Sequence, residues 1–399
     1  MRRLLLAAAL LLLVASCSKE KEVNPPAELT DFDAVLRVDR VWSAGVGSDG
    51  EALRLGLALA VEGERVYAAG RGGEVAAFEL KNGRAIWRTR TRARLGGGPG
   101  ANPELVVVGS SDGEVIALEA SNGSIRWRVN VGGEVLAPPA VADRAVVVRT
   151  VDGRLVALAP SDGRELWSYS QPVPRLSLRG TARPVIAGDL VLCGFDNGKV
   201  AAVELADGDL VWETIIAPPR GRTELERLVD IDSAVHVYDN DVFAVGFQGR
   251  SALLALDSGQ IWWAQEMSSH RGLGLDDSAV YVSTSGGEVV ALNRRTGTEL
   301  WRQDALLNRG LTAPAATDHG VAVADFQGYV HWLDKETGEL AARASSGGAR
   351  VTNPPVVAGD LLLVINDAGR ITAFRTRPRG DAGVAASRSG RSAAETASE

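Results

Sequence analysis

A repeat of about forty residues runs through most of this 399-residue chain and constrains its fold more than any other feature. Seven segments share one pattern, as in DGEVIALEASNGSIRW (112–127) and DGRLVALAPSDGRELW (152–167). In each segment two glycines lie ten residues apart, and in six a tryptophan follows four residues after the second glycine. The seventh segment has Ala342 at that position. Repetition at this period is typical of propellers and related repeat architectures.

Each repeat predicts a four-stranded antiparallel meander. The paired glycines indicate turns, because glycine readily adopts positive φ. Runs such as EVIALEA and SIRWRV predict strands, and APPAVADRAVVVRT (137–150) predicts two more, joined at ADR. Successive first glycines are separated by 40, 40, 45, 51, 38, 41 and 41 residues, and the last is Gly369. We therefore predict an all-β fold, an eight-bladed β-propeller of four-stranded antiparallel blades.

The eighth repeat lacks its last strand. No second turn with a following tryptophan comes after RITAFRT, whereas LRVDRVWSAG (36–45) near the N-terminus has the features of such a strand, with Trp42 at the expected place. We predict that this N-terminal strand completes the last blade, which would leave no open sheet edge in the ring.

The N-terminus predicts export and lipid attachment. Arg2 and Arg3 precede an apolar run of about 13 residues, shorter than the roughly 20 that span a membrane. The sequence VAS before Cys17 resembles a bacterial lipoprotein signal, in which that cysteine is acylated; several acyl chains make a durable anchor. The alternative is a plain secretory signal with an incidental cysteine. By the lipoprotein sorting rule, Ser18 points to the periplasmic face of the outer membrane.

These features divide the chain into a signal peptide (1–16), an acylated cysteine with a linker (17–33), the propeller (34–376) and a tail (377–399). The tail lacks periodicity and aromatic residues, so we predict that it is disordered. Cys193 lies in the apolar run LVLCGF and is the only other cysteine, so we expect a buried free thiol.

Little in the sequence indicates catalysis. The four histidines (His236, His270, His319 and His331) lack metal-ligand spacing, and a net charge of −7 disfavours nucleic-acid binding. The G-x-x-x-W ending resembles the repeat of pyrroloquinoline quinone enzymes, the eight-bladed quinoprotein dehydrogenases. Those enzymes carry adjacent cysteines against the cofactor, and this chain has none. We predict no catalytic residues, no metal and no cofactor.

The two long repeat steps place insertions in the same connection of consecutive blades, after the tryptophan strand: 168–184 and 213–235. We therefore expect them side by side on one face. Thr223 and Glu226 fit a capping box, which predicts one or two helical turns in ELERLV. The joint surface would offer Leu176, Leu178, Arg179, Arg227, Asp230 and Asp232, a composition that suits a protein interface. The alternative is that the leucines pack into the rim and the charges pair with one another.

The lipoprotein signal, the eight repeats, LSLRG and TELERLVDIDS together resemble the propeller lipoproteins of the outer-membrane β-barrel assembly machine. This resemblance implies a non-catalytic scaffold at the outer membrane. The implied partner is the barrel-forming subunit, met through its POTRA (polypeptide-transport-associated) domains, and nascent outer-membrane proteins are further candidates. The implied partner-binding residues are Leu176, Leu178 and Arg179 in the first loop and Asp230 and Asp232 in the second. A periplasmic quinoprotein-like enzyme and another envelope-binding module, such as a glycan binder, are the alternatives.

Overall fold

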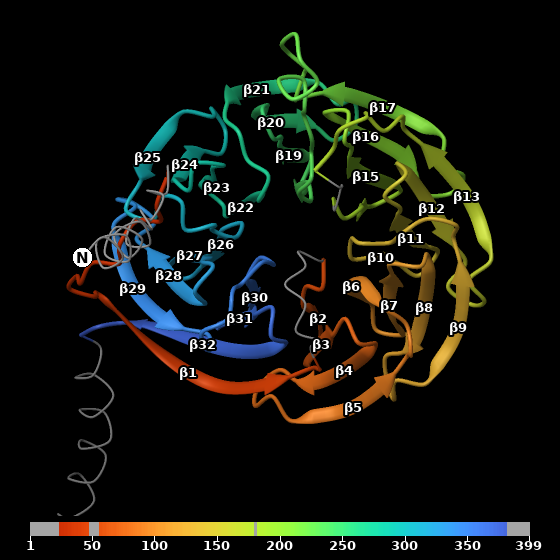
Figure 1. Ribbon diagram of the computed structural model, residues 1–399, viewed down its shortest axis with the longest axis horizontal. Coiled ribbons are helices and arrows are strands. Elements are labelled where there is room, and N and C mark those ends of the chain that lie inside the picture. Colours follow the sequence, from red (N-terminus) through yellow and green to blue (C-terminus); the bar gives the residue numbers. More distant parts are fainter. Residues whose placement is uncertain (1–23, 48–55, 179–181, 381–399) are drawn as a thin grey trace, which may run out of the picture.

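The computed structural model describes residues 24–47, 56–178 and 182–380 of the chain. Within them, eight four-stranded antiparallel sheets stand around a central axis as the blades of a flat ring (Figure 1). The predicted eight-bladed all-β propeller is therefore confirmed. None of these residues belongs to a helix that is long and apolar enough to cross a membrane.

In each of the first seven blades the strands follow one another from the axis outward. Blades one to four consist of β2 (Ala60–Glu62), β3 (Arg65–Ala69), β4 (Glu74–Glu79) and β5 (Ala85–Arg90); β6 (Leu95–Ala101), β7 (Leu105–Ser110), β8 (Glu114–Glu119) and β9 (Ile125–Asn130); β10 (Ala140–Val141), β11 (Val146–Arg149), β12 (Arg154–Leu158) and β13 (Glu165–Ser170); and β14 (Val185–Ala187), β15 (Leu190–Gly194), β16 (Lys199–Glu204) and β17 (Leu210–Ile215).

Blades five to seven repeat this order, and blade eight combines the two ends of the propeller. They consist of β18 (His236–Tyr238), β19 (Asp241–Val245), β20 (Arg250–Ala255) and β21 (Ile261–Glu266); β22 (Leu273–Leu275), β23 (Ala279–Ser283), β24 (Val289–Asn293) and β25 (Glu299–Gln303); β26 (Ala315–Thr317), β27 (Gly320–Ala324), β28 (Tyr329–Leu333) and β29 (Leu340–Ser345); and β30 (Val356–Ala358), β31 (Leu361–Ile365), β32 (Arg370–Pro378) and β1 (Leu36–Gly45).

The N-terminal strand closes the ring as predicted. β1 pairs antiparallel with β32 from Leu36 opposite Pro378 to Gly45 opposite Arg370. β32 therefore extends two residues past the predicted end of the propeller at 376, because its last residues pair with the start of β1. Apart from these, the predicted tail lies almost wholly in residues 381–399, outside the described residues.

Tryptophans on the outer strands join neighbouring blades. The Trp127 indole Nε1–H donates to the carbonyl oxygen of Pro160 at 2.8 Å, and its ring covers Gly163 in the next blade. A Cβ at Gly163 would lie 2.7 Å from the Trp127 ring, and the φ of +75° there also favours glycine. The same contact recurs in seven pairs: Trp42 with Gly83, Trp87 with Gly123, Trp127 with Gly163, Trp167 with Gly208, Trp212 with Gly259, Trp263 with Gly297 and Trp301 with Gly338. The repeated glycine and tryptophan thus form one joint between blades.

Blade seven inverts the tryptophan arrangement. In most blades the tryptophan faces an alanine on the third strand, as Trp127 faces Ala117. In blade seven, Ala342 on the fourth strand faces Trp332 on the third. Trp332 is buried and meets Phe374 edge to face, with ring centroids 5.6 Å apart. The reason is that blade eight has no turn between its third strand and β1, so no glycine is available to receive a ring from position 342.

The segment before β1 is not a free linker. Residues 24–35 lie against blade seven, where Leu29 packs on the hydrophobic core between blades six and seven. The backbone N–H of Val35 donates to the carbonyl oxygen of Ala341 at 3.0 Å. The predicted linker (17–33) is therefore docked over at least its second half. Cys17 and the predicted signal peptide lie outside the described residues.

Candidate functional site

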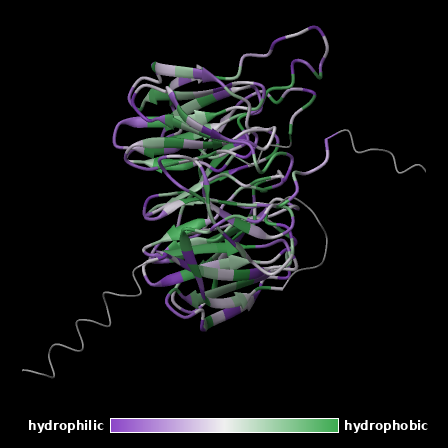
Figure 2. Cartoon of the chain, turned by 90° about the vertical axis from the view of Figure 1, so that its left-hand side faces the viewer, coloured by the Kyte–Doolittle hydropathy of each residue, from purple (hydrophilic) through white to green (hydrophobic). Residues whose placement is uncertain are grey.

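The two long connections leave the propeller from one face. In a four-stranded meander, the connection after the fourth strand and the turn between the second and third strands lie at the same end of the sheet. The connections comprise residues 171–184 and 216–235, three residues shorter than predicted at each start, because β13 and β17 continue that far. They project beyond the body of the disc (Figure 2, upper right).

A third long connection, residues 46–59, joins β1 to β2 and leaves from the same face. The glycine spacing gives no sign of this connection, because it precedes the first glycine of the repeat series. Residues 48–55 of this connection lie outside the described residues.

A hydrogen bond joins the two predicted loops. The backbone N–H of Leu178 in the first loop donates to Oδ2 of Asp230 in the second at 3.0 Å. Leu176 is 46% exposed and Leu178 is half-buried. Arg179 lies outside the described residues. The described parts of the two loops therefore form one surface, as their shared topology predicts.

The second loop contains the predicted capping box but no helix. The Glu226 N–H donates to Thr223 Oγ1 at 3.2 Å, and the Thr223 N–H donates to Glu226 Oε2 at 3.0 Å. Two backbone bonds close one turn: Arg227 N–H donates to the Thr223 carbonyl at 3.1 Å, and Leu228 N–H donates to the Leu225 carbonyl at 3.3 Å. Of the one or two helical turns predicted, one turn is present and no regular helix follows, because Val229 and Ile231 are buried and the chain continues there in extended form. The turn leaves Leu225 68% exposed at its tip, an apolar residue that the sequence analysis did not single out.

Asp230 is buried, so it cannot be the surface contact that the sequence suggested. Its backbone forms a bridge with Phe247, whose N–H donates to the Asp230 carbonyl oxygen at 2.7 Å. Burial, with the negative charges of Asp232 and Asp196, raises the pKa of its carboxyl to about 8. Asp232, two residues on, is only partly buried. Asp230 therefore positions the loops, whereas Asp232 lies nearer the surface.

A buried ion pair lies beneath the loops. Arg149 at the end of β11 donates from Nη2 to Oδ1 of Asp196 at 2.6 Å, across the boundary between blades three and four. Its guanidinium also lies 4.5 Å from the ring centroid of Phe195 and reaches Cys193 Sγ at 3.7 Å. Cys193 is a buried free cysteine, as predicted. Sequence reasoning overlooked this pair, although an arginine inside the apolar strand AVVVRT was a usable signal.

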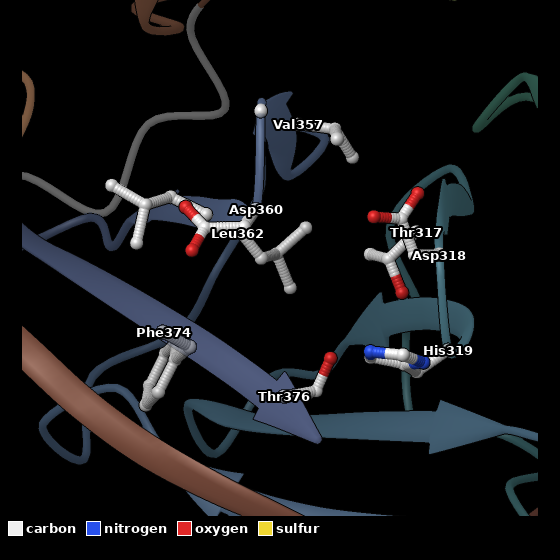
Figure 3. Close-up of a pocket in the computed structure, with 10 residues that line it drawn as sticks. Thr317, Asp318, His319, Val357, Asp360, Leu362, Phe374 and Thr376 are labelled. Atoms are coloured by element: carbon white, nitrogen blue, oxygen red, sulfur yellow. The ribbon is translucent and has the colours of Figure 1, made fainter. Parts of the chain in front are cut away.

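Within the described residues, no three histidine, cysteine or acidic side chains are placed to hold a metal ion. His331 instead lies in the core, 3.1 Å from Asp325. A cavity of about 30 Å³ between blades seven and eight is lined by Thr317, His319 and Phe374, among others (Figure 3). This volume has room for about one water molecule. The cavity opens beside the turns between first and second strands, on the face opposite the long connections.

Comparison with known proteins shows what the chain as a whole is similar to. The family model described as outer membrane protein assembly factor BamB matches residues 27–94, 71–303 and 285–380. The chain is 47% identical over 375 residues to the protein of that name from Pseudomonas aeruginosa, covering 94% of this chain and 98% of the relative. The crystal structure of BamB from Moraxella catarrhalis superposes with a TM-score of 0.78 at 30% identity, covering 85% of this chain and all of that one.

Enzymes share the architecture alone. Quinohemoprotein alcohol dehydrogenase from Comamonas testosteroni superposes with a TM-score of 0.65 at 12% identity, over 85% of this chain and 76% of that chain. Likeness at this identity reflects the propeller fold and carries no catalytic role.

Proposed function

Because the chain belongs to the family of outer membrane protein assembly factor BamB, we propose that it is a non-catalytic scaffold of the machine that assembles β-barrel proteins in the outer membrane. Its relatives are named as assembly factors, and the match covers nearly the whole propeller. The quinoprotein-like alternative has only fold-level similarity in its favour.

The protein acts from the periplasmic face of the outer membrane, held there by acyl chains on Cys17. Two observations support this: the signal-like N-terminus ending in VAS-Cys17, and the assembly of outer-membrane proteins named in the family description. Several acyl chains on one residue give durable attachment. The propeller then presents its loops to partners beside the membrane.

The two joined loops dock the POTRA domains of the barrel-forming subunit. The hydrogen bond from Leu178 to Asp230 carries this proposal, because it makes two loops from different blades into one surface. Leu176 and Leu225 supply exposed apolar groups on that surface. Asp232 supplies charge near that surface, and Asp230 joins the two loops. Arg179, the further contact residue of this proposal, lies outside the described residues.

Capture of purified POTRA domains by the full-length lipoprotein tests the site. We expect Leu176→Ala with Leu225→Ser to weaken capture by about tenfold or more, as loss of central apolar contacts does at other interfaces. Leu300→Ala is the matched control, because Leu300 is 50% exposed on β25, away from the loops. Capture that the loop variants leave unchanged would overturn the site.

Asp230 should behave as a positioning residue in the same assay. Asp230→Asn keeps an oxygen that can accept the Leu178 N–H, so it should retain capture. Asp230→Ala loses that acceptor and should weaken capture while leaving the exposed side chains in place. Equal weakening by both variants would contradict a role that acts through this hydrogen bond.

A further inference from the structure

The N-terminal segment 25–35, here called the strap, is fastened along blade seven. The backbone N–H of Ala27 donates to the carbonyl oxygen of Leu307 at 2.9 Å, and that of Val35 donates to Ala341 at 3.0 Å. Between these points Leu29 packs on the core shared by blades six and seven. The strap is therefore held at both ends and in the middle.

Two arginines of the propeller reach out to strap carbonyls. Arg309 Nη1 donates to the Ala27 oxygen at 2.8 Å, and Arg343 Nη1 donates to the Thr30 oxygen at 3.1 Å. The Arg343 guanidinium also lies 5.1 Å from the ring centroid of Phe32. Hydrogen bonds from a charged donor are stronger than neutral ones, so these two side chains are the main polar fastenings of the strap.

A buried network links the two arginines behind the strap. Arg309 Nε donates to Oδ2 of Asp325 at 2.8 Å, and His331 Nε2 lies 3.1 Å from the same oxygen. Arg343 Nε donates to His331 Nδ1 at 3.3 Å. Because Nδ1 accepts, the proton of a neutral His331 is on Nε2 and is donated to Asp325. Burial lowers the pKa of His331, which favours this neutral form.

These bonds form a continuous path from Thr30 through Arg343, His331, Asp325 and Arg309 back to Ala27. Asp325 and His331 are fully buried and Arg309 nearly so. The side chains of Arg309 and Arg343 are therefore oriented by the same buried pair, Asp325 and His331, and both end on the strap. This buried network therefore forms a preformed binding site for the strap.

The strap begins on the face that bears the long connections. Ala27 bonds to the connection between β25 and β26, which follows the fourth strand of blade six. β1 begins at Leu36 opposite Pro378, at the far end of β32 from the turn between second and third strands. The strap therefore crosses the rim, and its N-terminal end leaves from the loop face.

Only residues 18–24 separate Cys17 from the strap. At about 3.4 Å per residue, the eight Cα steps from Cys17 to Pro25 span at most about 27 Å. If the strap were detached as far as Leu36, the maximum distance from Cys17 to the propeller would rise to about 65 Å. We propose that the strap is a latch that keeps the loop face at blades six and seven beside a lipid bilayer. This inference rests on the acylation of Cys17 under the proposed function.

Hydrogen exchange of the full-length lipoprotein tests the latch itself. Arg343→Gln and, separately, Leu29→Ser should speed exchange of the Ala27 and Val35 amides by about tenfold or more, because local opening controls their exchange. Arg302→Gln is the matched control, since Arg302 bonds to Glu288 and Glu299 and does not touch the strap. Unchanged exchange in both latch variants would overturn the proposal.

Energy transfer on vesicles of phosphatidylethanolamine and phosphatidylglycerol with acceptor-labelled headgroups tests the consequence. A donor on Asp304→Cys, exposed on the loop face of blade six, should show at least twofold greater transfer than one on Asp207→Cys, in a turn of the opposite face of blade four. Cys193 is buried and should not compete for the label. The Asp304 signal should fall in the latch variants but not with Arg302→Gln.

The outcomes separate the two proposals. If the Cys17→Ser variant still binds the vesicles, the proposed acyl anchor on Cys17 is contradicted, and the hydrogen-exchange result still tests the latch. If the anchored protein shows the same transfer with and without an intact strap, the latch fails and the anchor stands.

Discussion

At the level of single residues, the carboxyl of Asp230 connects the two long connections from a buried position. Its Oδ2 accepts the Leu178 N–H, and within the described residues its Oδ1 has no hydrogen-bond partner. Asp232 and Asp196 add negative charge nearby, and Arg149 partly offsets them. The contact between the two loops therefore depends on a carboxyl group that favours its neutral form.

This carboxyl predicts a pH dependence of stability. The pKa of about 8 in the folded protein exceeds the ordinary value of 3.8, so between these values the folded state retains a proton that the unfolded state has lost. The free energy of unfolding should therefore decline as pH rises from about 4 to about 8. The Asp230→Asn variant has no such proton, so its free energy of unfolding should exceed that of the wild type by about 1–3 kcal/mol at pH 8. Urea unfolding measures this difference. A difference that does not shrink toward pH 4 would contradict this.

The Arg149–Asp196 pair gives a second prediction at the same scale. Asp196→Ala leaves the Arg149 charge buried without its carboxylate, which should cost about 3–5 kcal/mol of unfolding free energy. Replacing both, with Arg149→Met and Asp196→Leu, should cost much less, because no charge is then stranded. Denaturant unfolding of the three proteins measures the difference, and a double variant as unstable as the single one would argue against it.

At the level of elements, the joint between blades combines an outer-strand tryptophan with a turn glycine in the next blade. The glycine is needed for its positive φ and for the close approach of the ring. Blade seven supplies its indole from β28 instead, because β1 joins blade eight without a turn. The change at Ala342 is thus a consequence of ring closure by a terminal strand.

This explanation predicts that restoring the usual order will fail in blade seven. Trp332→Ala should cost about 3–5 kcal/mol, as other large core truncations do. Adding Ala342→Trp should recover little of that loss, since no glycine platform receives the ring. Thermal and denaturant unfolding of both variants test this, and near wild-type stability of the double variant would contradict it.

At the level of the whole molecule, β1 is what makes the ring continuous. It covers the outer edge of β32, places Trp42 on Gly83 of blade one and brings the strap to blade seven. The two ends of the propeller are therefore joined by one strand rather than by a linker.

Removal of that strand should open the propeller. A chain that begins at Val46 exposes the β32 edge and should lose cooperative unfolding and aggregate, since unpaired edges promote association. A chain that begins at Asn24 keeps the strap and closure and serves as the control. Addition of a synthetic 35–45 peptide should restore a cooperative transition in the shortened chain; monomeric, cooperative behaviour without the peptide would contradict the role of β1.

Much of the architecture could be predicted because each repeat specifies its own strands and turns within a short stretch of sequence. Each glycine pair and apolar run specifies turns and strands within about forty residues, and Trp42 marks the strand that completes the ring. The face shared by the two loops also follows from strand order alone. The burial of Asp230 could not be predicted, because it depends on Asp196, Phe247 and Leu178, which come from separate blades or loops.

The sequence by itself determined the number of blades, the closing strand and the place of the long connections, since periodicity and turn chemistry act between near neighbours. Only the tertiary structure decided which loop residues are exposed, that Trp332 replaces the indole missing at Ala342, and that the strap is docked. These features arise where distant segments meet, as when Arg309 and Arg343 bind carbonyls about 280 and 310 residues earlier in the chain. Contacts over such separations are set by the closed ring, and no local pattern encodes them.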